Sequence, residues 1–251
     1  MKKRTKYFWI IGMILKVGII LIVLANGCSS IEPKSVNTQD TKSFEETVLE
    51  ITKDAVTPEE KVEKIFYFVR DEVLFDFTGN NYMSAEEVLA IGRGACMNKA
   101  VLFVKMAKEA GVPARFHFMS VSKEALRDLL HPLAYRFWPD SFTHTFPEVQ
   151  LNGRWISMEA TFDKELHEIL LKRNLNFARY PHRRDISIEF SKSGIIGAQQ
   201  LTAIKGRESI YADNLTPLKE MEETISWIKI KILRPLILSL SRGNLEKLRE
   251  D

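Results

Sequence analysis

The chain of 251 residues has only two cysteines, Cys28 and Cys96, which excludes a small scaffold held together by several disulfides. Glycine and proline are also scarce, at 12 and 9 residues, which excludes a collagen-like or low-complexity chain. Hydrophobic residues make up 45% and charged residues 27%, as in ordinary globular proteins. These proportions allow a sizeable core and exclude intrinsic disorder for the bulk of the chain.

The chain also lacks a strong excess of charge of either sign. The formal net charge is +3, but five of the 36 basic residues lie within residues 1–27, which contain no Asp or Glu. The rest of the chain therefore carries 31 basic and 33 acidic residues. A body so close to neutrality lacks the broad positive surface that binds nucleic acid, so we expect no nucleic-acid partner.

The N-terminal residues are typical of an export signal. A basic start, MKKRTK, precedes two apolar runs, residues 7–15 and 17–25, which Lys16 separates. Small residues then precede Cys28, as they precede the cleavage site of a secretory signal. This arrangement resembles the lipobox of bacterial lipoproteins, in which the cysteine is lipidated and becomes the new N-terminus. Ala25 departs from that pattern, because a Leu is usual three residues before the cysteine.

An uncleaved transmembrane anchor over residues 7–25 is the alternative. Lys16 near its centre would cost about 2.5–3.5 kcal/mol on insertion, whereas each Leu, Ile, Phe or Val contributes about 0.3–0.6 kcal/mol, so the span remains feasible. Residues 1–27 are therefore predicted to be a signal peptide or membrane anchor, and residues 28–43, short of aromatic residues, a flexible tether. Both alternatives place the protein at the cell membrane, on its extracytoplasmic face.

Three patterns that start helices follow the tether. In each of them a Ser or Thr is followed three residues later by Glu, at Ser43, Thr57 and Ser84. Apolar residues at helical spacing after Thr57 predict a helix over about residues 58–72. The pattern after Ser84 predicts a short helix that stops at Gly92.

Cys96 begins a strong helical pattern that ends at Gly111. A cysteine in the first turn of a helix meets free backbone N–H groups and the positive end of the helix macrodipole, which favour the thiolate. Because the thiolate is the nucleophile, this position has a chemical consequence. The alternative is a buried structural cysteine. Gly94 favours the chemical role, since it leaves the backbone open to an approaching substrate carbonyl.

Two separated motifs resemble the transglutaminase-like superfamily, a papain-like group of enzymes that use Cys, His and Asp. The first, at residues 94–115, is similar to the family's nucleophile helix. The second, at residues 144–161, has a His that opens a strand, a Gly and a Trp in a turn, and an acidic residue four positions after the Trp. The resemblance implies that Cys96 is the nucleophile, His144 carries the proton, and Glu159, in place of the family's Asp, orients the histidine.

The Asn-Gly sequence at residues 152–153 predicts a compatible geometry independently. Between two strand-like runs it is a strong signal of a two-residue β-hairpin. The register that it sets would pair Phe146 with Glu159 and place His144 as the diagonal neighbour of Glu159, roughly 7–8 Å away at the backbone. A carboxylate on a ring nitrogen would fix the tautomer and orient His144 toward a thiol. The alternative is a half-exposed polar face without catalytic meaning.

Further candidate residues lie near these motifs. Asp163 shares the face of Glu159 but lies beyond the predicted strand end, so it is the alternative acid. The backbone N–H of Cys96 is the first candidate donor to an oxyanion, and Tyr82 is either a second donor or a core or rim aromatic residue. The chain has no CxxC, HExxH or Gly-rich phosphate loop, so we expect neither a metal nor a cofactor. The remaining histidines, whose spacing suggests no metal site, are His117, His131, His167 and His182.

Two segments leave alternatives open. Residues 172–184 combine five basic residues with Phe177 and Tyr180, which fits either a solvated basic loop or a contact with an anionic envelope polymer or lipid headgroup. Residues 216–251 are predicted to be an amphipathic helical segment with a pattern that Pro235 interrupts. This segment fits the membrane interface or docks on the rest of the protein.

These observations predict an α+β, papain-like domain over residues 44–215, in which the helix that begins at Cys96 packs on an antiparallel sheet. The resemblance implies acyl transfer from an amide bond of a peptide or protein, through a thioester. Resolution of the thioester by water, which we expect, would make the protein a peptidase or amidase, and resolution by an amine a cross-linking transglutaminase. The alternative is a non-catalytic envelope lipoprotein that uses the fold for binding or as a scaffold, which the substitution at Glu159 favours.

Overall fold

The computed structural model describes residues 42–78, 80–173, 190, 210–217 and 228–250, with side chains from residue 234 onward in the last range. The predicted signal peptide or anchor, nearly all of the tether, His182 and most of residues 172–184 lie outside the described residues. The chain divides into two compact units, residues 1–37 and 38–251, and every described residue belongs to the second. Within the described ranges, no helix combines the length and the apolar character needed to cross a membrane.

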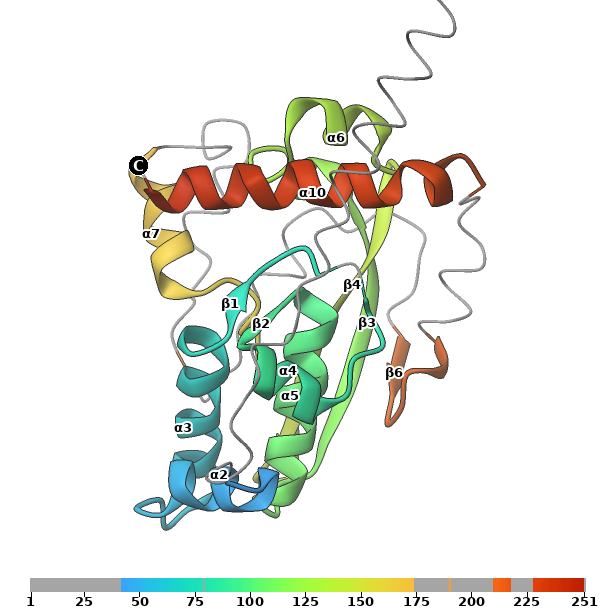
Figure 1. The fold of residues 1–251 in the computed structure, drawn as a ribbon. Helices are drawn as coiled ribbons and strands as arrows, with labels where there is room; N and C mark the ends of the chain where they lie inside the picture. The colour runs from blue at the N-terminus through green and yellow to red at the C-terminus, as the bar shows by residue number, and fades with distance from the viewer. Residues whose placement is uncertain (1–41, 79, 174–189, 191–209, 218–227, 251) are drawn as a thin grey trace, which may run out of the picture. The chain divides into compact units, whose positions relative to one another are not determined.

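The three capping patterns begin helices where the sequence predicts them (Figure 1). In each case the Ser or Thr side chain accepts the backbone N–H of the Glu three residues later, and that Glu carboxylate accepts the N–H of the capping residue. Gly92 ends the third helix in a left-handed conformation, at φ 66°. The helices are α2 (Phe44–Thr52), α3 (Pro58–Asp71) and α4 (Ala85–Ile91).

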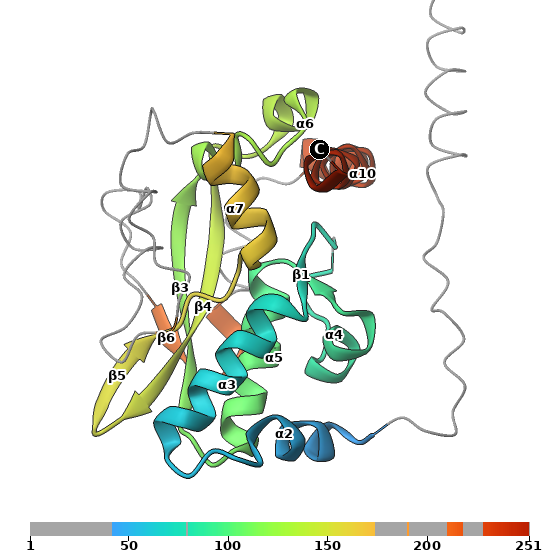
Figure 2. The ribbon, with the colours of Figure 1, turned by 90° about the vertical axis from the view of Figure 1, so that its left-hand side faces the viewer.

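Helix α5 (Cys96–Glu109) begins at the predicted nucleophile. A short strand, β2 (Arg93–Gly94), leads into it and pairs in parallel with β1 (Leu74–Phe75). One face of α5 packs on the sheet while α3 and α4 contact it from other sides, so most of the helix is buried (Figure 2). This arrangement holds the first residue of α5 at a fixed position relative to the sheet.

The main sheet is antiparallel and has the strand order β5-β4-β3-β6. The two strands that the sequence predicts around Asn152–Gly153 form a hairpin. Both turn residues have positive φ, as a type I′ turn requires. The ladder between β4 and β5 extends only to the pair of Glu148 with Ser157. The strands are β3 (Ala114–Ser122), β4 (Ser141–Leu151), β5 (Arg154–Ser157) and β6 (Ile210–Ala212).

Two large hydrophobic clusters and a small third one form the core of the described residues. The larger one lies between the sheet and α3, α4 and α5, and includes Phe66, Phe103 and Phe118. The second gathers at one end of the sheet, where the last helix crosses between α6 and α7 (Figure 1), and includes Phe75 and Leu245. Its elements are the 3-10 turn η1 (Lys123–Leu126), α6 (Pro132–Phe137), α7 (Lys164–Lys172) and α10 (Ile228–Glu250).

Pro235 interrupts the apolar pattern of the C-terminal segment, but it does not interrupt the helix. Helix α10 continues through Pro235, although proline removes one intrahelical hydrogen bond. Burial of Ile237, Leu245 and Leu248 stabilises the residues that follow it. Of the two alternatives for this segment, the described part of α10 docks on the rest of the unit. The α+β fold itself is confirmed.

Candidate active site

His144 on β4 contacts Glu159, which lies in the segment after β5. The distance between His144 Nε2 and Glu159 Oε2 is 2.8 Å. The other oxygen of Glu159, Oε1, accepts the backbone N–H of Thr161 at 3.1 Å. Only 14% of the His144 side chain and 7% of the Glu159 side chain are exposed. The carboxylate is therefore held on both oxygens, and one nitrogen of the imidazole is fixed.

The predicted pairing of Phe146 with Glu159 in a continuous ladder is wrong. Strand β5 ends at Ser157, and the hydrogen bond from Met158 N–H to the carbonyl of Pro147, at 2.8 Å, is the last along this edge among the described residues. The chain then leaves the ladder, and Glu159 reaches His144 through its longer side chain. The contact that the hairpin register predicts therefore forms without the strand pairing.

Cys96 is the first residue of α5 and a free, partly exposed thiol. Its sulfur lies close enough to His144 to help raise the pKa of the imidazole. Since Nε2 of His144 binds Glu159, Nδ1 is the ring nitrogen available to the sulfur. The structure thus brings together Cys96, His144 and Glu159 in the order that an acyl-transfer site uses: nucleophile, proton carrier and orienting carboxylate.

The charges around His144 favour its protonated form. Burial is the largest effect and acts to lower the pKa of His144, but the Glu159 carboxylate and the Cys96 sulfur outweigh it and raise the pKa to about 10. For Glu159, burial acts to raise the pKa, and the charge of His144 overcomes it and holds the pKa below the usual value. His144 is therefore an imidazolium, and it lies next to Cys96 at the N-terminus of α5.

Asn98, which the sequence analysis does not single out, fixes the start of α5. Its side chain is fully buried, and Oδ1 accepts the backbone N–H of Ala95 at 3.0 Å and the hydroxyl of Thr78 at 2.9 Å. Nδ2 donates to the carbonyl of Asn80 at 2.7 Å. Asn98 therefore ties the loop before α4 to the backbone next to Cys96. Its position at the third residue of the helix, where a capping box has Glu or Gln, is a signal that could have identified it.

The alternative acid, Asp163, does not lie against His144 in the described contacts. Its carboxylate caps α7 through the backbone N–H of Leu166 and forms an ion pair with Arg249. Tyr82 lies in the turn before α4 with 45% of its surface exposed, and its backbone N–H donates to Asn80 Oδ1 at 3.0 Å. Its role as an oxyanion donor therefore stays a prediction.

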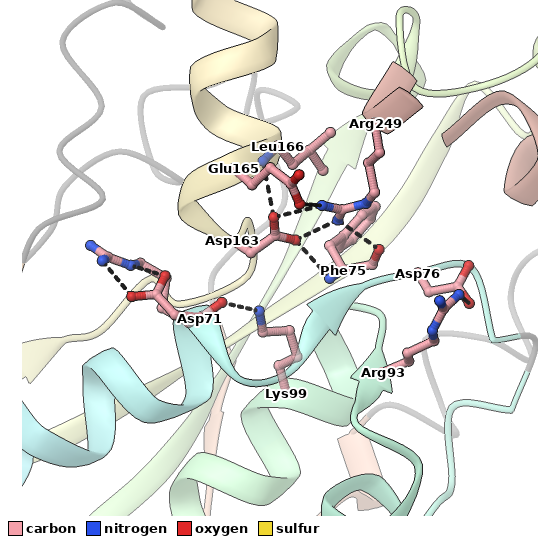
Figure 3. A network of polar contacts seen from close by, with 10 residues as sticks. Asp71, Phe75, Asp76, Arg93, Lys99, Asp163, Glu165, Leu166 and Arg249 are labelled. Atoms are coloured by element: carbon pink, nitrogen blue, oxygen red, sulfur yellow. Dashed lines mark hydrogen bonds and ion pairs between the residues drawn. The ribbon is translucent and has the colours of Figure 1, made fainter. Parts of the chain in front are cut away.

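Lys99, one turn after Cys96 on α5, is a second residue that the sequence analysis does not identify. Only 1% of it is exposed, and its Nζ donates to the carbonyl of Arg70 at 3.1 Å (Figure 3). Burial is the largest effect on its pKa and lowers it to about 7, against the opposing pull of Asp163, Asp71 and Glu159. A buried amine thus lies on the same helix as Cys96, one turn further along.

A family model matches the part of the chain that holds the candidate site. Residues 45–160 match the family model described as the transglutaminase-like superfamily, and this range holds Cys96, His144 and Glu159. The chain therefore carries a transglutaminase-like domain, as its two motifs predict. No curated protein matches the chain.

Two solved structures are similar to parts of the chain. A "putative cysteine protease" from Cytophaga hutchinsonii is 20% identical, with a TM-score of 0.38, over 47% of this chain and 36% of that protein. A "putative protease" from Parabacteroides distasonis is 12% identical, with a TM-score of 0.34, over 46% of this chain and 22% of that protein. The chain thus covers well under half of the length of either protein.

Proposed function

We propose that this domain is a thiol enzyme that transfers the acyl group of a peptide or protein amide to water through a thioester on Cys96. One observation carries the proposal: His144 bonds Glu159 through Nε2 and interacts with Cys96, which lies at the N-terminus of a buried helix. This arrangement supplies a nucleophile, a proton donor and an orienting carboxylate within one chain.

In the proposed reaction the Cys96 thiolate attacks the amide carbonyl carbon, and the carbonyl π electrons move to the oxygen. The backbone N–H of Cys96 donates to that oxyanion. The protonated His144 gives its proton to the amide nitrogen, the C–N bond breaks, and the amine leaves. Neutral His144 then removes a proton from water, which attacks the thioester, and the products are a carboxylic acid and the restored Cys96–His144 pair.

The same thioester could pass to a primary amine, which would make the enzyme cross-linking. Two arms of one experiment distinguish the acceptors: the acyl-enzyme formed from a peptide amide is offered water alone or water with a fluorescent primary amine. We expect the free acid as the main product in both arms. A fluorescent amide as the main product in the second arm would favour cross-linking instead.

A thiol-directed peptide probe tests the catalytic proposal. We expect the probe to label the parent chain on Cys96, to fail with Cys96→Ala, and to react more slowly with His144→Ala, by about 1,000-fold or more. His131→Ala is the matched control, because His131 caps α6 and lies in another element. A folded parent chain that reacts no faster than a free cysteine at any pH between 6 and 9 would favour the scaffold or binding function.

We also propose that residues 1–27 direct export and are then removed, and that the lipid on Cys28, the new N-terminus, holds the domain at the extracytoplasmic face of the membrane. The supporting pattern is the charged start, the apolar runs and the small residues before Cys28. Cys28→Ser should then remain unprocessed in membranes, as judged by intact mass. A mature parent chain that still carries residues 1–27 would favour the transmembrane anchor.

A further inference from the structure

The carboxylate of Asp163 joins three parts of the chain that are distant in sequence (Figure 3). Asp163 is 1% exposed, and its Oδ2 accepts the backbone N–H of Phe75 in β1 at 2.9 Å. Its Oδ1 accepts the N–H of Leu166 at the start of α7, also at 2.9 Å. Arg249 of α10 binds both oxygens, at 2.6 and 2.9 Å. One buried carboxylate thus connects β1, α7 and α10.

Two of these parts lead directly to the candidate site. Asp163 lies four residues after Glu159, and the segment between them has no ladder partner in β4, whose pairing with β5 ends at Ser157. Phe75 pairs with Gly94, which lies two residues before Cys96. Phe75 thus connects Asp163 to β2, the strand that precedes Cys96. The contact of Asp163 with Phe75 therefore sets the distance between β2 and the segment that carries Glu159.

Arg249 supplies the charge that allows this carboxylate to be buried. Besides its bidentate contact with Asp163, it bonds the exposed carboxylate of Glu165 at 2.8 Å and the carbonyl of Phe75 at 3.5 Å. Removing one partner of a buried ion pair leaves an uncompensated charge, which is strongly unfavourable. Without Arg249, the Asp163 carboxylate would move toward water or take up a proton. Its hydrogen bond with the backbone N–H of Phe75 would then weaken.

We propose that Arg249, acting through Asp163, is a positioning residue for Cys96, His144 and Glu159. Helix α10 is then part of the structure that aligns the acid with the nucleophile. This inference rests on the proposed function, because it assigns the ion pair to the alignment of that same site.

The test is the pH dependence of Cys96 alkylation by iodoacetamide in the full chain. We expect the parent to react at pH 6 at least about tenfold faster than a free cysteine, because the proposed site activates the thiol through His144. In Arg249→Gln this low-pH rate should fall at least tenfold. Arg249→Lys, which keeps the charge but loses the bidentate geometry, should restore part of it.

Glu165→Gln is the matched control, since it removes the other carboxylate partner of Arg249 and leaves Asp163 paired. It should stay within twofold of the parent. If Arg249→Gln does not fold, the double variant D163N/R249Q replaces it, because this variant leaves no buried charge and Asn still caps α7. A folded variant of either kind with the parent's profile would overturn the positioning role alone. A parent that lacks the low-pH reaction would overturn the proposed function as well.

Discussion

Glu159 has one methylene more than the Asp that the transglutaminase-like family has at this position, and the site accommodates the longer side chain. The strand that carries the acid leaves the β-ladder after Ser157, and Glu159 still bonds His144 Nε2 at 2.8 Å. The sequence predicts this contact because the Asn-Gly turn sets the register of the two strands. It does not predict where β5 ends, and it does not predict that Asp163, four residues after Glu159, pairs with Arg249, 86 residues further along the chain.

Glu159→Gln should lower the rate of probe labelling on Cys96 by about 100-fold or more, because an amide cannot balance the charge of the imidazolium. Glu159→Asp should be milder, since it keeps the carboxylate. Stopped-flow labelling at pH 7 measures both variants. A parent-like rate for Glu159→Gln, together with a crippled Asp163→Asn, would reassign the acid to Asp163.

Lys99 and His144 make opposite contributions to the pH dependence of folding. Burial, partly offset by nearby carboxylates, lowers the pKa of Lys99 to about 7, so between about pH 7 and 10 the unfolded chain holds more protons at this residue. This contribution makes stability rise with pH. Burial opposes but does not prevent the rise of the His144 pKa to about 10, and the stability it confers is complete below the unfolded pKa and lost as pH rises toward 10.

The substitution Lys99→Met removes the contribution that makes folding stability rise with pH, and it leaves the opposite contribution of His144. The midpoint of urea unfolding should therefore fall between pH 7 and 10 more steeply in this variant than in the parent. Lys108→Met, an exposed position on the same helix, is the control and should keep the parent's slope. Equal slopes for Lys99→Met and the parent would contradict the opposing titration.

At the scale of elements, local residue patterns predicted most of the site's supports. The capping residues at Ser43, Thr57 and Ser84 and the hairpin at residues 152–153 form as the sequence predicts, because each depends on neighbouring residues alone. Helix α7, capped by Asp163, was not predicted. The elements that α10 packs against were left open for a different reason: they are far away from it in the sequence.

A substitution at Gly94 tests how closely β2, the strand before Cys96, packs against α5. A Cβ added at this position would lie 2.7 Å from Cβ of Asn98, so the start of α5 would have to move. Gly94→Ala should cost about 1–3 kcal/mol in unfolding free energy and slow the alkylation of Cys96. Gly243→Ala, where an added Cβ meets nothing within 4 Å inside α10, should instead be neutral or slightly stabilising. Similar effects of the two substitutions on urea unfolding would argue against this packing.

At the scale of the whole second unit, the catalytic motifs and the C-terminal helix belong to one packed structure. The contacts that join them link residues 86 or more positions apart, such as Asp163 with Arg249 and Asp76 with Arg242. No periodicity or spacing in a single sequence encodes such pairs. The sequence therefore predicted the amphipathic helix at residues 216–251 but left open what its apolar face covers.

A substitution at Leu245 tests how much the packing of α10 contributes to the stability of the domain. It is 2% exposed and shares the second hydrophobic cluster with Phe75, the residue that Asp163 bonds in β1. Leu245→Ala should lower the unfolding free energy by about 2–5 kcal/mol, since it leaves a cavity in this cluster. Leu133→Ala, at a position on α6 that is 45% exposed, is the control and should cost much less.

Because the cluster includes Phe75 of β1, the substitution Leu245→Ala should shift the whole unfolding transition rather than release α10 alone. Urea unfolding followed by tryptophan fluorescence and by far-ultraviolet circular dichroism should give one coincident transition at a lower midpoint. An unchanged midpoint by fluorescence, with early loss of helical signal, would mean that α10 detaches independently. Cys96 alkylation at pH 6 on the same samples would then show whether the site keeps its reactivity without the helix.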